Sequence, residues 1–124
     1  MTSIPKNPRV KSLSFLKWTR KQLDVINFQY GCVAHHIKTK TIGGMGFKAD
    51  DYLVMPLLPK NHDYESPIGI HRNINKWEKK NKPQAFHIKQ NLENAYNEGV
   101  INHDIWLKYT EICEELINKR RGLM

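Results

Sequence analysis

The chain has 124 residues, of which 40% are hydrophobic and 26% charged, and it carries 20 Lys and Arg against 12 Asp and Glu. This length is typical of one domain, and the composition suits a globular chain and argues against disorder. The sequence has no apolar run of about 18 residues, which excludes a membrane-spanning helix. The two cysteines, Cys32 and Cys113, are far apart in the sequence, which argues against a disulfide framework and favours a reducing cytoplasm.

The positive charge is concentrated in the first third of the chain. Residues 1–40 hold eight Lys and Arg against one acid, whereas residues 41–124 hold twelve against eleven. This asymmetry favours an anionic partner, and nucleic acid is the first candidate. The alternative is a solvated basic arm without a partner.

The N-terminal half is predicted to contain a basic arm, a short helix and two strands. The arm covers residues 1–12, and the helix is expected within 13–22. Residues rich in β-branched and aromatic side chains predict strands within 25–37 and 52–58, separated by a glycine-rich loop at 39–51. A further short helix is expected after Pro59.

Two amphipathic helices are predicted in the C-terminal part. The first begins near Pro83, ends near Gly99 and presents one apolar face, formed by Phe86, Ile88, Leu92, Ala95 and Tyr96. The second begins at Asn102 or His103 and stops at Gly122, with apolar residues at three-to-four spacing. We expect the two helices to pack together against the strands. Cys113 lies on the second apolar stripe and is predicted to be an inert core thiol.

Four of the six histidines lie between positions 35 and 71. His35 and His36 end a predicted strand, where adjacent side chains point to opposite faces. One imidazole can then bind a metal ion while the other faces a substrate, and His62 can supply a second imidazole to the ion. Neutral imidazoles suit Zn, Ni, Mn or Fe, and added oxygen ligands shift the preference toward Mg or Mn. The alternative is that these histidines only satisfy backbone groups of the loops.

The order of these residues resembles the HNH nuclease superfamily. The segments that carry the resemblance are Ala34-His35-His36-Ile37, Gly43-Gly44-Met45-Gly46-Phe47-Lys48, Asp50-Asp51 and Pro56-Leu57-Leu58-Pro59-Lys60-Asn61-His62. They look most like the phage Ref-like branch of RecA-dependent nucleases, which carries a His-His dipeptide, a Gly-rich loop ending in Lys, an Asp and a Pro-Leu-Cys-x-x-x-His segment. The resemblance covers about residues 13–97.

The resemblance implies an α+β fold built on a ββα-metal (His-Me finger) core. The basic arm at 1–12 would precede a single nuclease domain at 13–124. Within that domain, the motif core would span 32–75, and flanking C-terminal helices would occupy 83–121.

The resemblance also implies roles for five residues. His35 and His62 would bind one divalent cation (Mg, Mn, Ni or Zn), and His71 would be a third ligand or a phosphate contact. His36 would be the general base, oriented by Asp51 in the central position of the motif. These roles suit phosphodiester hydrolysis, which needs a deprotonated water, a counter-charge on the phosphorane and a stabilised leaving oxygen.

The central position could be occupied by either of two adjacent acids, Asp50 and Asp51. Their side chains point in opposite directions along an extended segment, so only one of them can face His36. The spacing of fifteen residues after His36 favours Asp51.

Relatives in this superfamily commonly carry a structural zinc in two Cys-x-x-Cys pairs, and this chain lacks those thiols. The corresponding positions are Asp24 and Asn27, then Leu58 and Asn61. We therefore expect the structural zinc ribbon to be lost. Apolar packing, with Leu58 turned inward and the C-terminal helices behind it, is predicted to replace the ion as scaffold.

The leading hypothesis is a metal-dependent DNA endonuclease of phage recombination or repair, acting in the cytoplasm of a bacterial host cell. DNA is the expected partner, a RecA-like recombinase is a second candidate, and no membrane is involved. The candidate phosphate contacts are Lys11, Lys17, Arg20, Lys21, Lys48 and Arg72. The alternative is a non-catalytic nucleic-acid-binding or recombinase-interacting protein on a degenerate HNH scaffold. Docking to a recombinase would need an exposed apolar stripe on residues 103–117.

Overall fold

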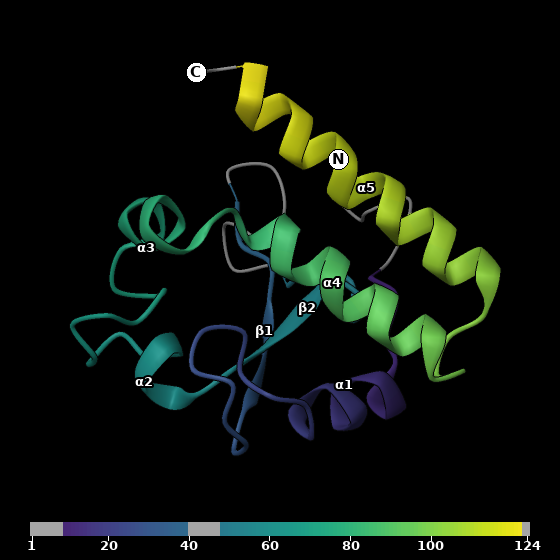
Figure 1. Cartoon of the computed structure of the whole chain (residues 1–124), viewed down its shortest axis with the longest axis horizontal. Coiled ribbons are helices and arrows are strands. Elements are labelled where there is room, and N and C mark those ends of the chain that lie inside the picture. Colours follow the sequence, from purple (N-terminus) through teal and green to yellow (C-terminus); the bar gives the residue numbers. More distant parts are fainter. Residues whose placement is uncertain (1–8, 40–47, 123–124) are drawn as a thin grey trace, which may run out of the picture.

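The computed structural model describes residues 9–39 and 48–122 of the chain. In this part, the chain forms a small α+β domain with five helices and one two-stranded sheet (Figure 1). The elements in chain order are α1 (Leu13–Arg20), β1 (Val33–His36), β2 (Val54–Leu57), α2 (Pro59–His62), α3 (Ile74–Asn81), α4 (Gln84–Asn97) and α5 (His103–Gly122).

The antiparallel hairpin of β1 and β2 lies at the centre of the domain. Its register places His35 opposite Met55 and His36 opposite Val54. Every residue of β2 is buried, because α1 and α4 both pack against this strand. The hairpin therefore fixes the two adjacent histidines on a rigid, covered element.

The predicted strand over 25–37 is only partly correct, because its first half forms a turn. The backbone N–H of Asp24 donates to the carbonyl of Gln29, and the N–H of Phe28 donates to the carbonyl of Asp24, each at 2.9 Å. These hydrogen bonds form a turn, and the strand therefore begins only at Val33. We refer to residues 24–29 below as the Asp24 turn.

α4 lies between the sheet and α5, so the domain has three layers at this side (Figure 1). Both predicted C-terminal helices are confirmed. Burial raises the pKa of the Cys113 thiol to about 12, which keeps the thiol protonated. The predicted face of α4 is wrong at Phe86, which is 42% exposed. Two polar residues, Gln84 and Asn91, are buried on that helix instead.

α3 was not expected from the sequence. The side chain of Asn73 caps its first turn by accepting from the N–H of Lys76 at 3.0 Å, and Trp77 is the large side chain that it buries. Lysines and asparagines fill most of its other positions, and its two apolar side chains, Ile74 and Trp77, are too few to predict a helix from the sequence.

The four positions matched to zinc-binding cysteines meet in space and are joined by hydrogen bonds. The fully buried carboxylate of Asp24 accepts from the backbone N–H groups of Ile26, Asn27 and Leu58 and from the side-chain amide of Asn61. The same amide donates to Asn27 Oδ1 at 2.7 Å. Leu58 is buried as predicted. The prediction that apolar packing alone replaces the zinc ion as scaffold is wrong, because these hydrogen bonds form a polar network at the four positions.

The end of the predicted basic arm is part of the fold. Val10 N–H donates to Asp50 Oδ1 and Ser12 N–H to Asp51 Oδ2, while Asp51 N–H donates to the carbonyl of Val10. Residues 1–8 of the arm and the glycine-rich segment 40–47 lie outside the described residues. In the described residues, no helix is long and apolar enough to cross a membrane.

Candidate functional site

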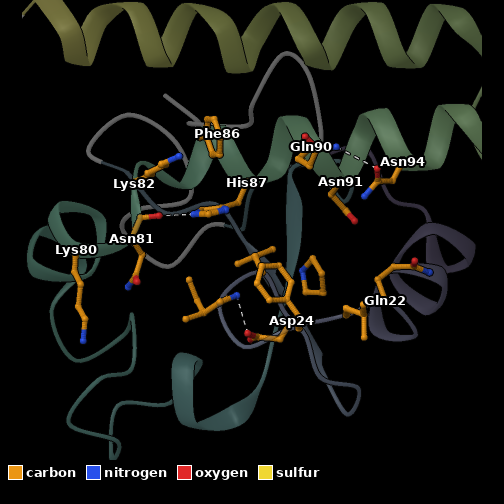
Figure 2. A pocket seen from close by; sticks show the side chains of 15 residues that line it. Gln22, Asp24, Lys80, Asn81, Lys82, Phe86, His87, Gln90, Asn91 and Asn94 are labelled. Carbon is orange, nitrogen blue, oxygen red and sulfur yellow. Dashed lines mark hydrogen bonds between the residues drawn. The ribbon is translucent and has the colours of Figure 1, made fainter.

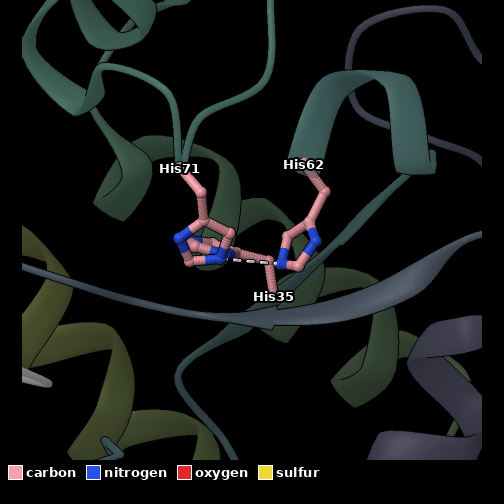
Figure 3. A group of neighbouring side chains, drawn as sticks. All are labelled: His35, His62 and His71. Carbon is pink, nitrogen blue, oxygen red and sulfur yellow. Dashed lines mark hydrogen bonds between the residues drawn. The ribbon is translucent and has the colours of Figure 1, made fainter. Parts of the chain in front are cut away.

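Three histidines from separate parts of the fold converge on one point (Figure 3). His35 comes from β1, His62 is the last residue of α2, and His71 lies between α2 and α3. One ring nitrogen of each lies within 4.8 Å of the others. His62 Nε2 and His71 Nε2 are 3.0 Å apart. The structure therefore brings together all three residues predicted as metal ligands.

A short backbone ladder holds His71 beside His62. Ile70 N–H donates to the carbonyl of Asn61 at 2.9 Å, and His71 N–H donates to the carbonyl of His62 at 3.2 Å. The intervening loop closes so tightly that a Cβ atom at Gly69 would lie 2.0 Å from the Asp63 carbonyl oxygen. Only glycine fits this position, so Gly69 allows the tight loop that places His71 beside His62.

Gln84, the first residue of α4, fixes the tautomer of His35. Its Oε1 accepts from His35 Nε2 at 2.9 Å and from Lys38 N–H at 3.0 Å. Its Nε2 donates to the Lys38 carbonyl and to Glu78 Oε2, so a flipped amide would set its NH₂ group against the Lys38 N–H and its oxygen against two acceptors. An amide oxygen only accepts, so His35 carries its proton on Nε2. The lone pair of Nδ1 is left available for an ion.

The sequence reasoning missed Gln84. A signal was present, because Gln84 precedes Ile88 and Leu92 at helical spacing and so belongs to the buried stripe of α4. A polar residue on such a stripe needs a buried partner, and the partner here is 49 positions away in the chain.

The cluster favours neutral imidazoles. Burial, which outweighs the opposite effect of the Gln84 hydrogen bond, and the neighbouring histidines together lower the pKa of His35 to about 3. Burial also lowers the pKa of His71, as does the proximity of His62. His62 donates through Nδ1 to Asp63 at 3.1 Å, which leaves its Nε2 facing His71.

These residues fit a divalent cation of intermediate softness. Nitrogens at about 2.0–2.1 Å from a tetrahedral ion lie roughly 3.3 Å apart, close to the 3.0 Å between His62 and His71. Three imidazoles suit Zn, Ni or Mn, whereas Mg prefers oxygen ligands and retains water.

His36 forms a separate pair with Asp51. His36 Nε2 lies 2.8 Å from Asp51 Oδ1. Burial raises the pKa of Asp51, but hydrogen bonds from His36 and Ser12 and the charge of Arg9 outweigh burial and hold this pKa below its usual value. An ionised carboxylate only accepts, so His36 donates through Nε2 and keeps a lone pair on Nδ1.

Asp51, rather than Asp50, faces His36. Asp50 instead accepts from the Tyr109 hydroxyl at 2.9 Å, and this contact fixes the Asp50 carboxylate against α5. Sequence reasoning did not anticipate Arg9, which also donates to Asp51 Oδ1. The N-terminal segment thus contributes a cation to this pair.

The predicted phosphate contacts are all exposed. Four of them lie just before, along or at the C-terminal end of α1, namely Lys11, Lys17, Arg20 and Lys21. Arg72 directly follows His71 and is held against Tyr64, with its guanidinium carbon 5.2 Å from the ring centre. Lys48 borders the undescribed segment.

The fold and this site define a small α+β domain with a three-histidine cluster beside a His–Asp pair. A family model described as a protein of unknown function, DUF968, matches residues 1–99. This match covers most of the sequence, and the chain belongs to the DUF968 family. No curated protein and no solved structure matches it.

Proposed function

We propose that this protein is a metal-dependent DNA endonuclease of phage recombination or repair, with β1, β2 and α2 forming a ββα-metal core. One observation carries the proposal. Adjacent residues of β1 supply both a buried member of the histidine cluster, His35, and the partner of Asp51, His36. This is the arrangement that the resemblance to HNH nucleases implies.

The residues of the chain divide the chemistry between them. His36 Nδ1 takes the proton of a water whose oxygen attacks the phosphorus, and the bond from phosphorus to the 3′ oxygen breaks. Asp51 holds the imidazole in the required tautomer and stabilises the imidazolium that forms.

His35, His62 and His71 would hold a divalent cation, and Gln84 would orient His35 behind it. A bound cation supplies counter-charge to the phosphorane and to the leaving oxygen. The donor set favours Zn, Ni or Mn among the candidate ions.

The exposed cations would hold the DNA backbone without reading its sequence. The side chains that would contact phosphates are all solvent-exposed, namely Lys11, Lys17, Arg20, Lys21, Lys48 and Arg72. Affinity should then fall steeply with salt, because each phosphate contact releases counterions.

The alternative is a non-catalytic protein that binds DNA or a RecA-like recombinase. Recombinase docking through α5 receives little support, because the apolar stripe of that helix packs on the core. Tyr109 and Cys113 are buried, and Ile105, Ile112 and Leu116 are partly buried against the same cluster. Non-catalytic DNA binding is separated from catalysis by experiment.

The experiment is a plasmid-cleavage assay with Zn, Ni, Mn or Mg. The parent protein should nick or linearise the plasmid, and His36→Ala should abolish cleavage while keeping DNA affinity. His103→Ala is the matched control, because His103 is exposed at the start of α5. Absence of cleavage by the parent with all four ions would refute the nuclease and favour the binding protein.

A further inference from the structure

A cavity of the domain shares no lining residue with the histidine cluster (Figure 2). It is a cavity of about 580 Å³ between the Asp24 turn, β2 and the corner where α3 meets α4. The volume lies within the range of about 300–1,000 Å³ that is typical of small-ligand sites. The proposed cleavage chemistry does not use this cavity.

Both described non-glycine residues with a positive φ angle line this cavity. Phe28 has φ 56° and Lys82 has φ 79°. Such conformations are unfavourable for side chains other than glycine, and they cluster at functional sites where the surroundings impose them. Phe28 is also 69% exposed, so core packing does not explain the conformation of this residue.

Several amide side chains line the cavity, and two lysines lie at one edge of it. Five amide side chains belong to Gln22, Asn81, Gln90, Asn91 and Asn94. Those of Gln22, Gln90 and Asn91 also donate within the protein, which orients them. Lys80 and Lys82 lie on the α3–α4 side. The one carboxylate among the described lining residues, Asp24, is fully buried and accepts from four groups of the polar network.

We propose that this cavity, the amide pocket, holds an unpaired nucleobase of the DNA strand on which the protein acts. An exposed aromatic ring offers a stacking face, amides match the edges of bases, and lysines match the flanking phosphates. A base can enter such a cavity, and present its Watson–Crick edge to the amides, only when it is out of the duplex stack. The identity of the strand as DNA rests on the proposed function, and the pocket makes unpaired DNA the preferred substrate class.

The test compares the binding of two fluorescein-labelled probes, a single-stranded oligodeoxynucleotide and a fully paired hairpin, by anisotropy in EDTA. Phe28→Gly should weaken single-strand binding by about tenfold or more and leave hairpin binding unchanged. Lys82→Gly should reduce the slope of log affinity against log salt for the single strand by about one. Glycine accepts a positive φ without strain, so both variants should keep the parent melting temperature.

Tyr30→Ala is the matched control, because Tyr30 is 73% exposed on the same segment but does not line the pocket. Its affinity for both probes should equal that of the parent. Unchanged single-strand affinity in folded Phe28→Gly, or an equal loss in Tyr30→Ala, would overturn the pocket. Because these measurements need no metal, failure of cleavage and failure of the pocket are separate results.

Discussion

The hydrogen bonds of Gln84 lead to a quantitative prediction for metal affinity. Gln84→Met keeps the side-chain length but removes the acceptor for His35 Nε2 and both partners of the Lys38 backbone. Removing a residue that orients a metal ligand typically weakens metal binding 10- to 100-fold, which corresponds to about 1.4–2.8 kcal/mol of binding free energy. The unpaired groups should also destabilise the fold by about 2–4 kcal/mol.

A second variant separates the two effects. Gln84→Glu keeps an acceptor for His35 but loses the donor to Lys38 and sets a second carboxylate beside Glu78. We expect Gln84→Glu to lower stability as well, yet to retain metal affinity.

Calorimetric titration of Zn or Ni into each folded variant provides the measurement, with circular dichroism reporting the fold. Gln90→Met, on the exposed side of the same helix, is the control and should bind metal as the parent does. The reasoning is refuted if folded Gln84→Met binds the ion as tightly as Gln90→Met.

Three further predictions concern the His–Asp pair and the polar network. Asp51→Asn should slow cleavage by about 100-fold, whereas Asp50→Asn, which changes the contacts to Tyr109 and to the Val10 N–H but none to His36, should slow it far less; equal losses in the plasmid assay would contradict the assignment. The folded-state pKa of Asp51 lies below its unfolded value, so the ionised carboxylate stabilises the fold above about pH 4. This stabilisation is lost as the pH falls through the folded pKa. The urea midpoint should therefore drop less on acidification in Asp51→Asn than in the parent. Asn61→Leu should cost about 2–4 kcal/mol in urea unfolding, because buried Asp24 loses an amide donor; an unchanged midpoint would show that the network does not support the fold.

Periodicity and residue order made much of the fold predictable. α4 and α5 followed from apolar spacing, a local pattern that a single sequence displays directly. The grouping of His35, His62 and His71 followed from what the resemblance to HNH nucleases implies.

Features that depend on distant polar partners were not predictable in this way. The Cys-x-x-Cys spacing of the HNH relatives identified Asp24 and Asn61 as corresponding positions. The sequence predicted apolar packing there, whereas the two residues form hydrogen bonds. Gln84 acts on His35 across the fold, and Arg9 and Ser12 are held by the Asp51 carboxylate, about forty positions away in the chain. In each case a buried polar group found its partner through tertiary structure, which local propensity does not encode.

The central claim is that one metal ion and one general base act on the same phosphate. A crystal structure after soaking with Mn or Zn, with anomalous scattering to locate the ion, tests this claim most directly. We predict an ion among His35, His62 and His71, with His36 Nδ1 about 3–5 Å away across a water, the reach that a general base requires. Empty, diverging imidazoles, or an ion that His36 cannot reach through one water, would contradict it.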